Sequence, residues 1–497
     1  MERYILAIDQ STSGTKALIV NQNGSVIARS SAEHKQSYPA PGWVEHDPLE
    51  IYNNVMKAAL DVLRKTGISP GSLAALTVTN QRETAVMWDL ETGIPVYNAI
   101  VWQCQRTAEQ CARMKEAGHE ELVREKTGLM LDPYFSAAKW RWMLEHADGA
   151  AKKLDEGKLL AGTIDSWLIW KLTGGRVHAT DYTNASRTSL FNIHTLEWDE
   201  EMCSLFGVPS ALLPEVKSSD DLFGYTEESG WLGACVPVSG IIGDSQAALF
   251  GNLCLEEGTA KATYGTGTSV LMNVGSKPAF SGNGLVQAIA WGRSGEVTYA
   301  LEAVIRTSGD SIKWIRDNLG LFDSFDEMEL LLESVRGNEG VYLIPAFVGL
   351  GAPYWQPNAR AAITGMNRGT GKAHIIRAAL ESIAYQVRDA VEVLQAASGI
   401  SLSELRADGG AADNSFLMQF QSDMLSKKVV RSGVAELSAM GSVYMGGLAV
   451  GYWSSLEEIV KQQTTPRSYE PQMDPDEVER NCAGWKQAVA SVLVQLV

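Results

Sequence analysis

The sequence predicts an α/β protein made of two related domains, and three observations support this prediction. Segments with strand-like and helix-like composition alternate along the chain, which is typical of α/β architecture. Two similar segments, residues 4–20 and 258–272, lie one in each half. The length of 497 residues is more than one hydrophobic core normally organises. We therefore expect an N-terminal domain at residues 1–250 and a C-terminal domain at residues 251–497.

Each of the two similar segments is expected to form a hairpin, in which a turn of Gly, Ser and Thr joins two apolar strands. Such a turn presents backbone N–H groups and hydroxyls to an anion, and no bulky side chain blocks the approach. The first segment also carries Asp9 at the end of its strand, a suitable place for a divalent cation. The pair of hairpins suggests two domains that clasp a nucleotide phosphate chain, which indicates ATP chemistry, although the first turn is not a P-loop motif.

The expected elements of the first half follow from short apolar runs and from amphipathic or buried helical stretches. In chain order they are a strand at 73–78, a polar cluster at 79–84, a strand at 85–88, helices at 106–116, 139–146 and 164–172, a strand at 237–242 and a short helix at 246–249. Both strands at 73–78 and 237–242 end in polar residues, so functional groups are expected at those strand ends.

The second half shows the same alternation of strand-like and helix-like segments. A long helix is expected at 375–397, a strand that enters a Gly-rich turn at 405–410, a helix at 415–425 and a closely packed, Ala- and Gly-rich helix at 438–450. No low-complexity or Pro-rich linker separates the halves, so the domain boundary is placed near residue 250. A return of the C-terminal helix to the first domain stays open as an alternative.

Composition excludes several classes of function. The contents of 45% hydrophobic and 20% charged residues are ordinary for a globular protein, and the net charge of −17 argues against binding to nucleic acid or to anionic membranes. No apolar stretch reaches the roughly 18 residues of a membrane span, so no membrane insertion is expected. The N-terminus enters a strand directly, and the six scattered cysteines lack CxxC spacing. We expect a cytoplasmic protein with reduced thiols.

Two carboxylates stand at predicted strand ends. Asp9 is either a turn-forming residue that caps its hairpin or a group that faces a metal ion. The residues Thr12-Ser13-Gly14-Thr15-Lys16 favour the second interpretation, because they add hydroxyls, a flexible Gly and a cation at a spacing suited to phosphate. Asp244 is either the N-cap of the following helix or a catalytic carboxylate, and the two roles are compatible.

The cluster 79–84 contains adjacent Arg82 and Glu83, which are either surface ion pairs of little energetic value or the rim of a substrate site. Six consecutive polar residues between two apolar strands favour the rim. Trp102 and Tyr134 are aromatic residues beside polar ones. Core packing is the ordinary explanation for them, and the alternative is that they cover the carbon edge of a polyol while each offers one polar group.

With these residues assembled, the chain resembles the FGGY carbohydrate kinase family over essentially its whole length. The segments that resemble the family include Pro41-Gly-Trp-Val-Glu-His-Asp-Pro48, Thr79-Asn-Gln-Arg-Glu-Thr84, Tyr97-Asn-Ala-Ile-Val-Trp-Gln-Cys104, Asp181-Tyr-Thr-Asn-Ala-Ser-Arg187 and Gly349-Leu-Gly-Ala-Pro-Tyr-Trp355. Both family signature regions are present, at residues 134–146 and 361–381. The resemblance implies two actin-like (ribonuclease H-like) domains with the active site in the cleft between them.

The resemblance also implies a reaction, in which Mg²⁺ and ATP are used to phosphorylate a terminal hydroxyl of a polyol, with glycerol the expected acceptor and sn-glycerol 3-phosphate the product. By motif, Asp244 matches the general base and Asp9 the carboxylate near the magnesium ion. The residues that match the acceptor site are Arg82, Glu83, Trp102 and Tyr134, and those that match the phosphate and nucleotide site are Thr12, Ser13, Gly14, Thr266, Gly267, Gly309, Gly410 and Asn414. Relatives commonly form dimers or tetramers, so a homo-oligomer is expected.

The chain departs from the family pattern on the acceptor side. Ser245 stands where members that act on glycerol usually have Gln, and Ser269 stands where they often have Phe. Both changes enlarge the pocket, so one hypothesis is a longer substrate such as erythritol, threitol or xylitol, or a ketopentose. The alternative is a glycerol-specific pocket that neighbours or water refill. A third class, an actin- or chaperone-like ATPase, is disfavoured by Asp244 beside a polyol rim.

Departures also occur on the nucleotide side and in regulatory segments. Lys16 replaces Arg and keeps a positive charge without the bidentate fork, and Lys313 stands where Gln is common. The stretch that corresponds to the fructose 1,6-bisphosphate loop of some members, residues 230–235, has no Arg. No histidine lies between His194 and His374, where other members are phosphorylated. We therefore expect ATP use to survive and both forms of control to be absent.

Overall fold

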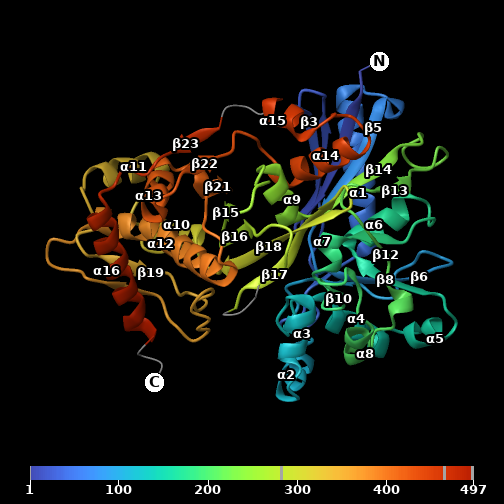
Figure 1. Cartoon of the computed structure of the whole chain (residues 1–497), viewed down its shortest axis with the longest axis horizontal. Helices are drawn as coiled ribbons and strands as arrows, with labels where there is room; N and C mark the ends of the chain where they lie inside the picture. The colour runs from blue at the N-terminus through green and yellow to red at the C-terminus, as the bar shows by residue number, and fades with distance from the viewer. Residues whose placement is uncertain (1, 280–283, 463–465, 494–497) are drawn as a thin grey trace.

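The computed structural model describes residues 2–279, 284–462 and 466–493 (Figure 1). Two large mixed sheets form its framework, one from each half of the chain, with helices packed against them. Among the described residues, no helix is both long enough and apolar enough to cross a bilayer.

The first sheet has the strand order β13-β14-β5-β1-β2-β3. Its strands are β1 (Tyr4–Gln10), β2 (Gly14–Val20), β3 (Val26–Glu33), β5 (Leu73–Asn80), β13 (Leu222–Tyr225) and β14 (Pro237–Gly243). β1, β2 and β3 form an antiparallel meander, and β5 and β14 continue the sheet parallel to β1. The central strands β1 and β5 are almost wholly buried, because helices cover both faces.

The second sheet repeats this arrangement in the order β17-β18-β16-β15-β21-β22-β23. Its strands are β15 (Thr259–Tyr264), β16 (Thr268–Asn273), β17 (Val286–Arg293), β18 (Glu296–Ile305), β21 (Glu404–Asp408), β22 (Val429–Arg431) and β23 (Arg467–Tyr469). β15, β16 and β18 form the antiparallel meander, while β21 and β22 run parallel to β15. The duplicated topology confirms the prediction of an α/β protein with two actin-like, ribonuclease H-like domains.

The first half also contains a smaller sheet, short strand pairs and several helices. β4 (Glu45–His46), β7 (Ala99–Ile100), β6 (Ala85–Asp89) and β8 (Leu159–Thr163) form a four-stranded sheet, and β9 (Ala179–Asp181), β10 (Phe191–Asn192), β11 (Glu197–Trp198) and β12 (Glu215–Lys217) form short pairs. The helices are α1 (Pro48–Thr66), α2 (Ala108–Glu116), α3 (Glu120–Thr127), α4 (Ser136–His146), α5 (Ala150–Asp155), α6 (Ile164–Leu172), α7 (Tyr182–Ala185), α8 (Glu200–Phe206) and α9 (Asp244–Gly251).

The second half adds a strand pair and a layer of helices. The pair is β19 (Tyr342–Ile344) with β20 (Ala362–Thr364), and the helices are α10 (Gly309–Asp317), α11 (Phe325–Glu333), α12 (Lys372–Ser398), α13 (Ser415–Leu425), α14 (Leu437–Ala449), α15 (Leu456–Gln462) and α16 (Pro475–Leu493). The helices expected at 164–172, 375–397, 415–425 and 438–450 correspond to α6, α12, α13 and α14, with ends within three residues.

Helix α14 crosses back to the first sheet, where it packs against α9, β14 and β5 (Figure 1). Its small residues permit this, since a Cβ on Gly441 would collide with the carbonyl oxygen of Ala247 and one on Gly446 would lie 2.5 Å from Thr77 Cγ2. The returning helix is thus α14. The last helix, α16, packs in the core of the second half, where Trp485 stacks on Tyr385 at 5.2 Å. The division at residue 250 stays a prediction.

Candidate active site

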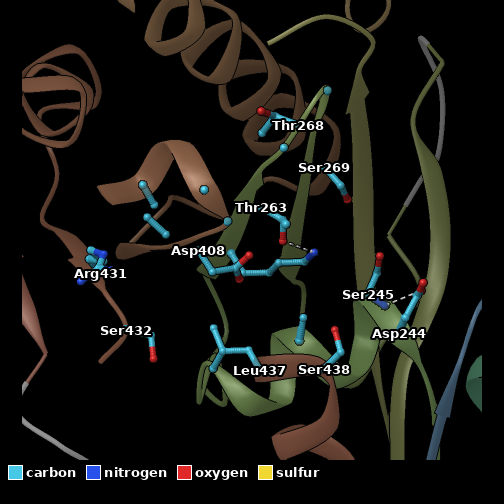
Figure 2. Close-up of a pocket in the computed structure, with 18 of the residues that line it drawn as sticks. Asp244, Ser245, Thr263, Thr268, Ser269, Asp408, Arg431, Ser432, Leu437 and Ser438 are labelled. Carbon is cyan, nitrogen blue, oxygen red and sulfur yellow. Dashed lines mark hydrogen bonds between the residues drawn. The ribbon is translucent and has the colours of Figure 1, made fainter. Parts of the chain in front are cut away.

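A cavity of about 670 Å³ lies between the two halves of the chain (Figure 2). It is lined by Asp244 and Ser245 from α9, by residues of β15, of the start of β16 and of the end of β18, by the Gly-rich turn after β21 and by the segment that leads into α14. Asp244 and Ser245 lie on one side, and Arg431 and Ser432 lie on the opposite side (Figure 2). Of the predicted site residues, Asp244, Ser245, Gly267, Ser269 and Gly410 line this cavity directly.

Asp244 is positioned by the junction of β14 and α9. The helix N-cap is Gly243, so Asp244 is the first helical residue and its carboxylate accepts a hydrogen bond from the N–H of Ser245 at 2.7 Å. Arg82 Nε lies 3.0 Å from Asp244 Oδ1. The N-cap interpretation is therefore wrong in detail, and the carboxylate, with 39% of its side chain exposed, is available to a ligand.

Asp9 is the penultimate residue of β1 and is only 8% exposed. Burial raises its pKa to about 7; Lys16 opposes this increase, while the negative charges of Asp244 and Glu436 add to it. The two predicted carboxylates are thus close enough to interact. No group of three or more His, Cys, Asp or Glu that could hold a metal ion occurs in the described part of the chain.

The polar cluster after β5 folds inward instead of facing solvent. Arg82 Nη1 donates to Gln246 Oε1 at 3.1 Å and Nη2 donates to Ser245 Oγ at 3.1 Å. Glu83, which has a φ of 60°, is 1% exposed and accepts from Arg187 Nε at 2.5 Å. Burial raises the pKa of Glu83, against the effect of the two arginines. The interpretation of this cluster as surface ion pairs is therefore wrong.

Trp102 and Tyr134 lie side by side, with their rings edge to face at 5.4 Å. Trp102 Nε1 donates to Thr12 Oγ1 at 3.0 Å, which joins this aromatic wall to the turn of the first hairpin. Lys139 fixes the Tyr134 segment, because its buried ammonium donates to the carbonyls of residues 133, 134 and 135 at 2.5–2.9 Å. Both rings are half-buried, so one edge of each remains available for contact.

The first hairpin is tightly closed. Ser11 N–H donates to the Gly14 carbonyl at 2.8 Å, and a Cβ on Gly14 would lie 2.8 Å from the carbonyl oxygen of Ala32, so glycine is required there. Thr12 and Ser13 stand at the tip of this turn. Lys16 Nζ lies 2.6 Å from Glu436 Oε2. Lys16 is therefore ion-paired with the segment that precedes α14.

The second hairpin is closed by Gly265 N–H, which donates to the Gly267 carbonyl at 2.9 Å. Gly309 and Ser308 N–H donate to the carbonyls of Gly265 and Thr266 at 3.0 and 2.8 Å, so the start of α10 is held against this turn. Lys313 is exposed on α10, and the Asn414 side chain caps α13 by accepting from Leu417 N–H at 2.8 Å. Neither lines the cavity in the described ranges of the chain.

Three buried charged residues had no role in the sequence-based prediction. Lys261 on β15 is 2% exposed, donates to Thr263 Oγ1 at 2.9 Å and lines the cavity, and burial lowers its pKa. Glu302 on β18 and Arg187 after α7 are 2% and 1% exposed. Burial raises the pKa of Glu302, but Arg82, Arg187 and Lys261 outweigh this and hold it at about 2. Lys261 and Glu302 each lie within a mostly apolar strand, which was the available signal, whereas Arg187 lies in a polar segment after α7.

This fold and site define a phosphotransferase of the ribonuclease H-like class, with two hairpins and a carboxylate pair at the junction of its domains. Comparison with known proteins agrees. Residues 4–251 match the N-terminal domain of the FGGY family of carbohydrate kinases and residues 260–450 match its C-terminal domain. The chain belongs to this family and is a carbohydrate kinase.

Three similar proteins illustrate the relationship. A glycerol kinase from Salmonella arizonae is 51% identical over 488 residues, which cover 98% of this chain and 97% of that protein. The structure of Plasmodium falciparum glycerol kinase with ADP has a TM-score of 0.93 and 37% identity, covering 99% of this chain and 98% of that one. A gluconate kinase from Lactobacillus acidophilus, with a TM-score of 0.87, 20% identity and full coverage of both chains, shares the fold alone.

Proposed function

We propose that this protein phosphorylates a terminal hydroxyl of glycerol with ATP, giving sn-glycerol 3-phosphate and ADP. The arrangement of Asp244 supports this most directly, because its carboxylate is held by Arg82 and opens into the cavity beside the second hairpin. The similarity to proteins named glycerol kinase, at 51% identity over almost the whole chain, supports the same acceptor.

In this proposal, the acceptor hydroxyl lies against Asp244, and Arg82, Glu83, Trp102 and Tyr134 hold the polyol. The terminal oxygen attacks the γ-phosphorus, the bond from that phosphorus to the β,γ-bridging oxygen breaks, and Asp244 receives the hydroxyl proton late in the reaction. The hairpin turns around Thr12–Gly14 and Thr266–Gly267 offer N–H groups to the phosphates. Gly309, Gly410, Lys313 and Asn414 are proposed to lie on the nucleotide side.

Asp9 is proposed to hold Mg²⁺, directly or through water, together with the ATP phosphates. The fit rests on the setting of Asp9, a buried carboxyl near the end of β1 whose pKa is raised by burial and raised further by the negative charge of Asp244, so a bound cation would stabilise its ionised form. When bound, the ion would neutralise charge on the β- and γ-phosphates. Lys16 adds positive charge nearby, although its ion pair with Glu436 fixes its direction.

A second candidate acceptor is a four- or five-carbon polyol, or a ketopentose. The observation in its favour is that Ser245 and Ser269 are short side chains that both line the cavity. Values of kcat/KM for glycerol, erythritol, threitol, xylitol and xylulose, measured by ADP formation, separate the candidates. A strong preference for glycerol supports the main proposal, whereas a preference for a longer acceptor contradicts it. A cytoplasmic homo-oligomer is part of the same proposal.

A further inference from the structure

A chain of ion pairs runs through the acceptor side of the site. Arg82 Nε lies 3.0 Å from Asp244 Oδ1, and Arg82 Nη2 lies 3.3 Å from Glu302 Oε1. Glu302 Oε2 lies 3.0 Å from Arg187 Nη1, and Arg187 Nε lies 2.5 Å from Glu83 Oε1. Negative and positive charges therefore alternate without a break from Asp244 to Glu83.

The central member of this chain comes from the other half of the protein. Glu302 lies on β18 of the second sheet, whereas Arg82 follows β5 and Arg187 follows α7 in the first half. Glu302 and Arg187 have only 2% of their side chains exposed, and Arg82 has 6%. In so dry a setting each guanidinium needs a matching carboxylate, since a lone buried charge is costly.

Both unusual serines hydrogen-bond to this chain. Ser269 Oγ donates to Glu302 Oε1 at 3.2 Å, and Ser245 Oγ accepts from Arg82 Nη2 at 3.1 Å. A Phe at position 269 would offer no donor to Glu302. The two departures from the usual family residues thus act on adjacent members of one network, beyond any effect on pocket size.

We propose that Glu302 is a positioning residue, which holds the Arg82 guanidinium against Asp244 and Arg187 against Glu83, with Ser269 fixing its carboxylate. Removing the charge of Glu302 leaves each arginine with one carboxylate, Asp244 for Arg82 and Glu83 for Arg187, and removes the group that bridges the two guanidiniums. The planar guanidiniums then lose the arrangement that orients the acceptor. Because Glu302 belongs to the second sheet, the acceptor site is completed only when both halves are packed together. This inference rests on the proposed function, since it assigns the network to a polyol acceptor.

The first test is Glu302→Gln in the full-length protein, assayed with the polyol that the wild type uses best. Loss of orientation predicts a fall of about 100-fold in kcat/KM for the acceptor, with KM for ATP within about twofold of the wild type. Glu381→Gln is the matched control, because Glu381 is a 3% exposed carboxylate paired with Arg377 at 2.7 Å on α12, outside the cavity. Equal effects of both variants on acceptor kcat/KM overturn the proposal.

The second test, Ser269→Ala, keeps every charge and so avoids a folding defect. Loss of a hydrogen bond to a charged group predicts a fall of about tenfold in acceptor kcat/KM. In the Glu302→Gln background the same change is expected to have an effect within about twofold, because Ser269 acts through Glu302. Full additivity of the two changes contradicts the proposed linkage.

A crystal structure of Glu302→Gln separates this inference from the proposed function. Displacement of the Arg82 guanidinium from Asp244 supports the positioning role, whichever substrate the enzyme takes. An unmoved Arg82 overturns it, even if the wild type phosphorylates glycerol. Conversely, a wild type that ignores every polyol contradicts the proposed function, and the position of Arg82 in the variant still decides the role of Glu302.

Discussion

Asp244 is held in a fixed position by its neighbours and is also exposed to the cavity. It starts α9, is paired with Arg82 at 3.0 Å and retains 39% side-chain exposure, whereas the surrounding charged groups are buried. A carboxylate in this setting can orient a hydroxyl and accept its proton, and the neighbouring guanidinium prevents it from rotating away.

Asp244→Asn is expected to lower kcat for polyol phosphorylation by about 1000-fold, because the amide keeps the shape but cannot accept the proton. The measurement is ADP formation at saturating ATP and polyol, with the melting temperature followed in parallel. Asp317→Asn is the control, since Asp317 lies on the surface of α10, where it pairs with Arg316. A drop of less than about tenfold in the Asp244 variant would argue against a role as general base.

At the scale of elements, the packing of α14 on α9 joins the end of the chain to the first sheet. Gly441→Ala is expected to reduce the free energy of unfolding by about 3 kcal/mol, because the new methyl collides with the Ala247 carbonyl and the backbone must move. Urea unfolding measures the difference. Gly371→Ala is the matched control, since a Cβ there meets nothing within 4 Å, and similar losses in both variants would show that the contact is not tight.

His178 links β8 to the residues before β9. Its Nε2 lies 2.9 Å from the Ala161 carbonyl, its ring stands on edge to Trp88 at 5.3 Å, and burial lowers its pKa to about 4. The unfolded chain binds a proton near pH 6.5, before the folded protein does. The stability that the neutral ring contributes is therefore fully present above pH 6.5 and is lost as the pH falls towards 4.

The expected consequence is measurable against His178→Gln. The difference in unfolding free energy between wild type and variant should shrink by about 3 kcal/mol between pH 6.5 and pH 4. Urea titrations at half-unit pH intervals provide the comparison, and other titrating groups cancel because both proteins contain them. A difference that stays constant over this range would contradict a lowered pKa at His178.

In the molecule as a whole, each half repeats the same topology, and the features of this topology that have local sequence signals could be predicted. Asp9 and Asp244 could be found because each ends an apolar strand, and Arg82 and Glu83 because they interrupt two such strands. The hairpins at 4–20 and 258–272 matched β1–β2 and β15–β16, since alternating composition and turn residues are local signals.

Glu302 and Arg187 could not be assigned in this way, because the ion pair between them joins one half of the chain to the other. A Glu within a mostly apolar strand, such as Glu302 in β18, is usually a solvent-facing residue. Its role in the network depends on Arg82 and Arg187, which come from the first half of the chain. The packing of α14 against the first sheet likewise depends on tertiary contacts, and no local pattern in residues 437–449 specifies it.

In the proposed reaction, two ribonuclease H-like halves, joined at Asp244, transfer a phosphoryl group from ATP to glycerol. The most direct test incubates the purified protein with Mg²⁺ and ATP, with and without glycerol, and follows ADP and the phosphorylated product by ³¹P NMR. We expect ADP to form only with glycerol, in equal amount to sn-glycerol 3-phosphate. ADP release that is indifferent to glycerol, or an acceptor preference for a longer polyol, would contradict it.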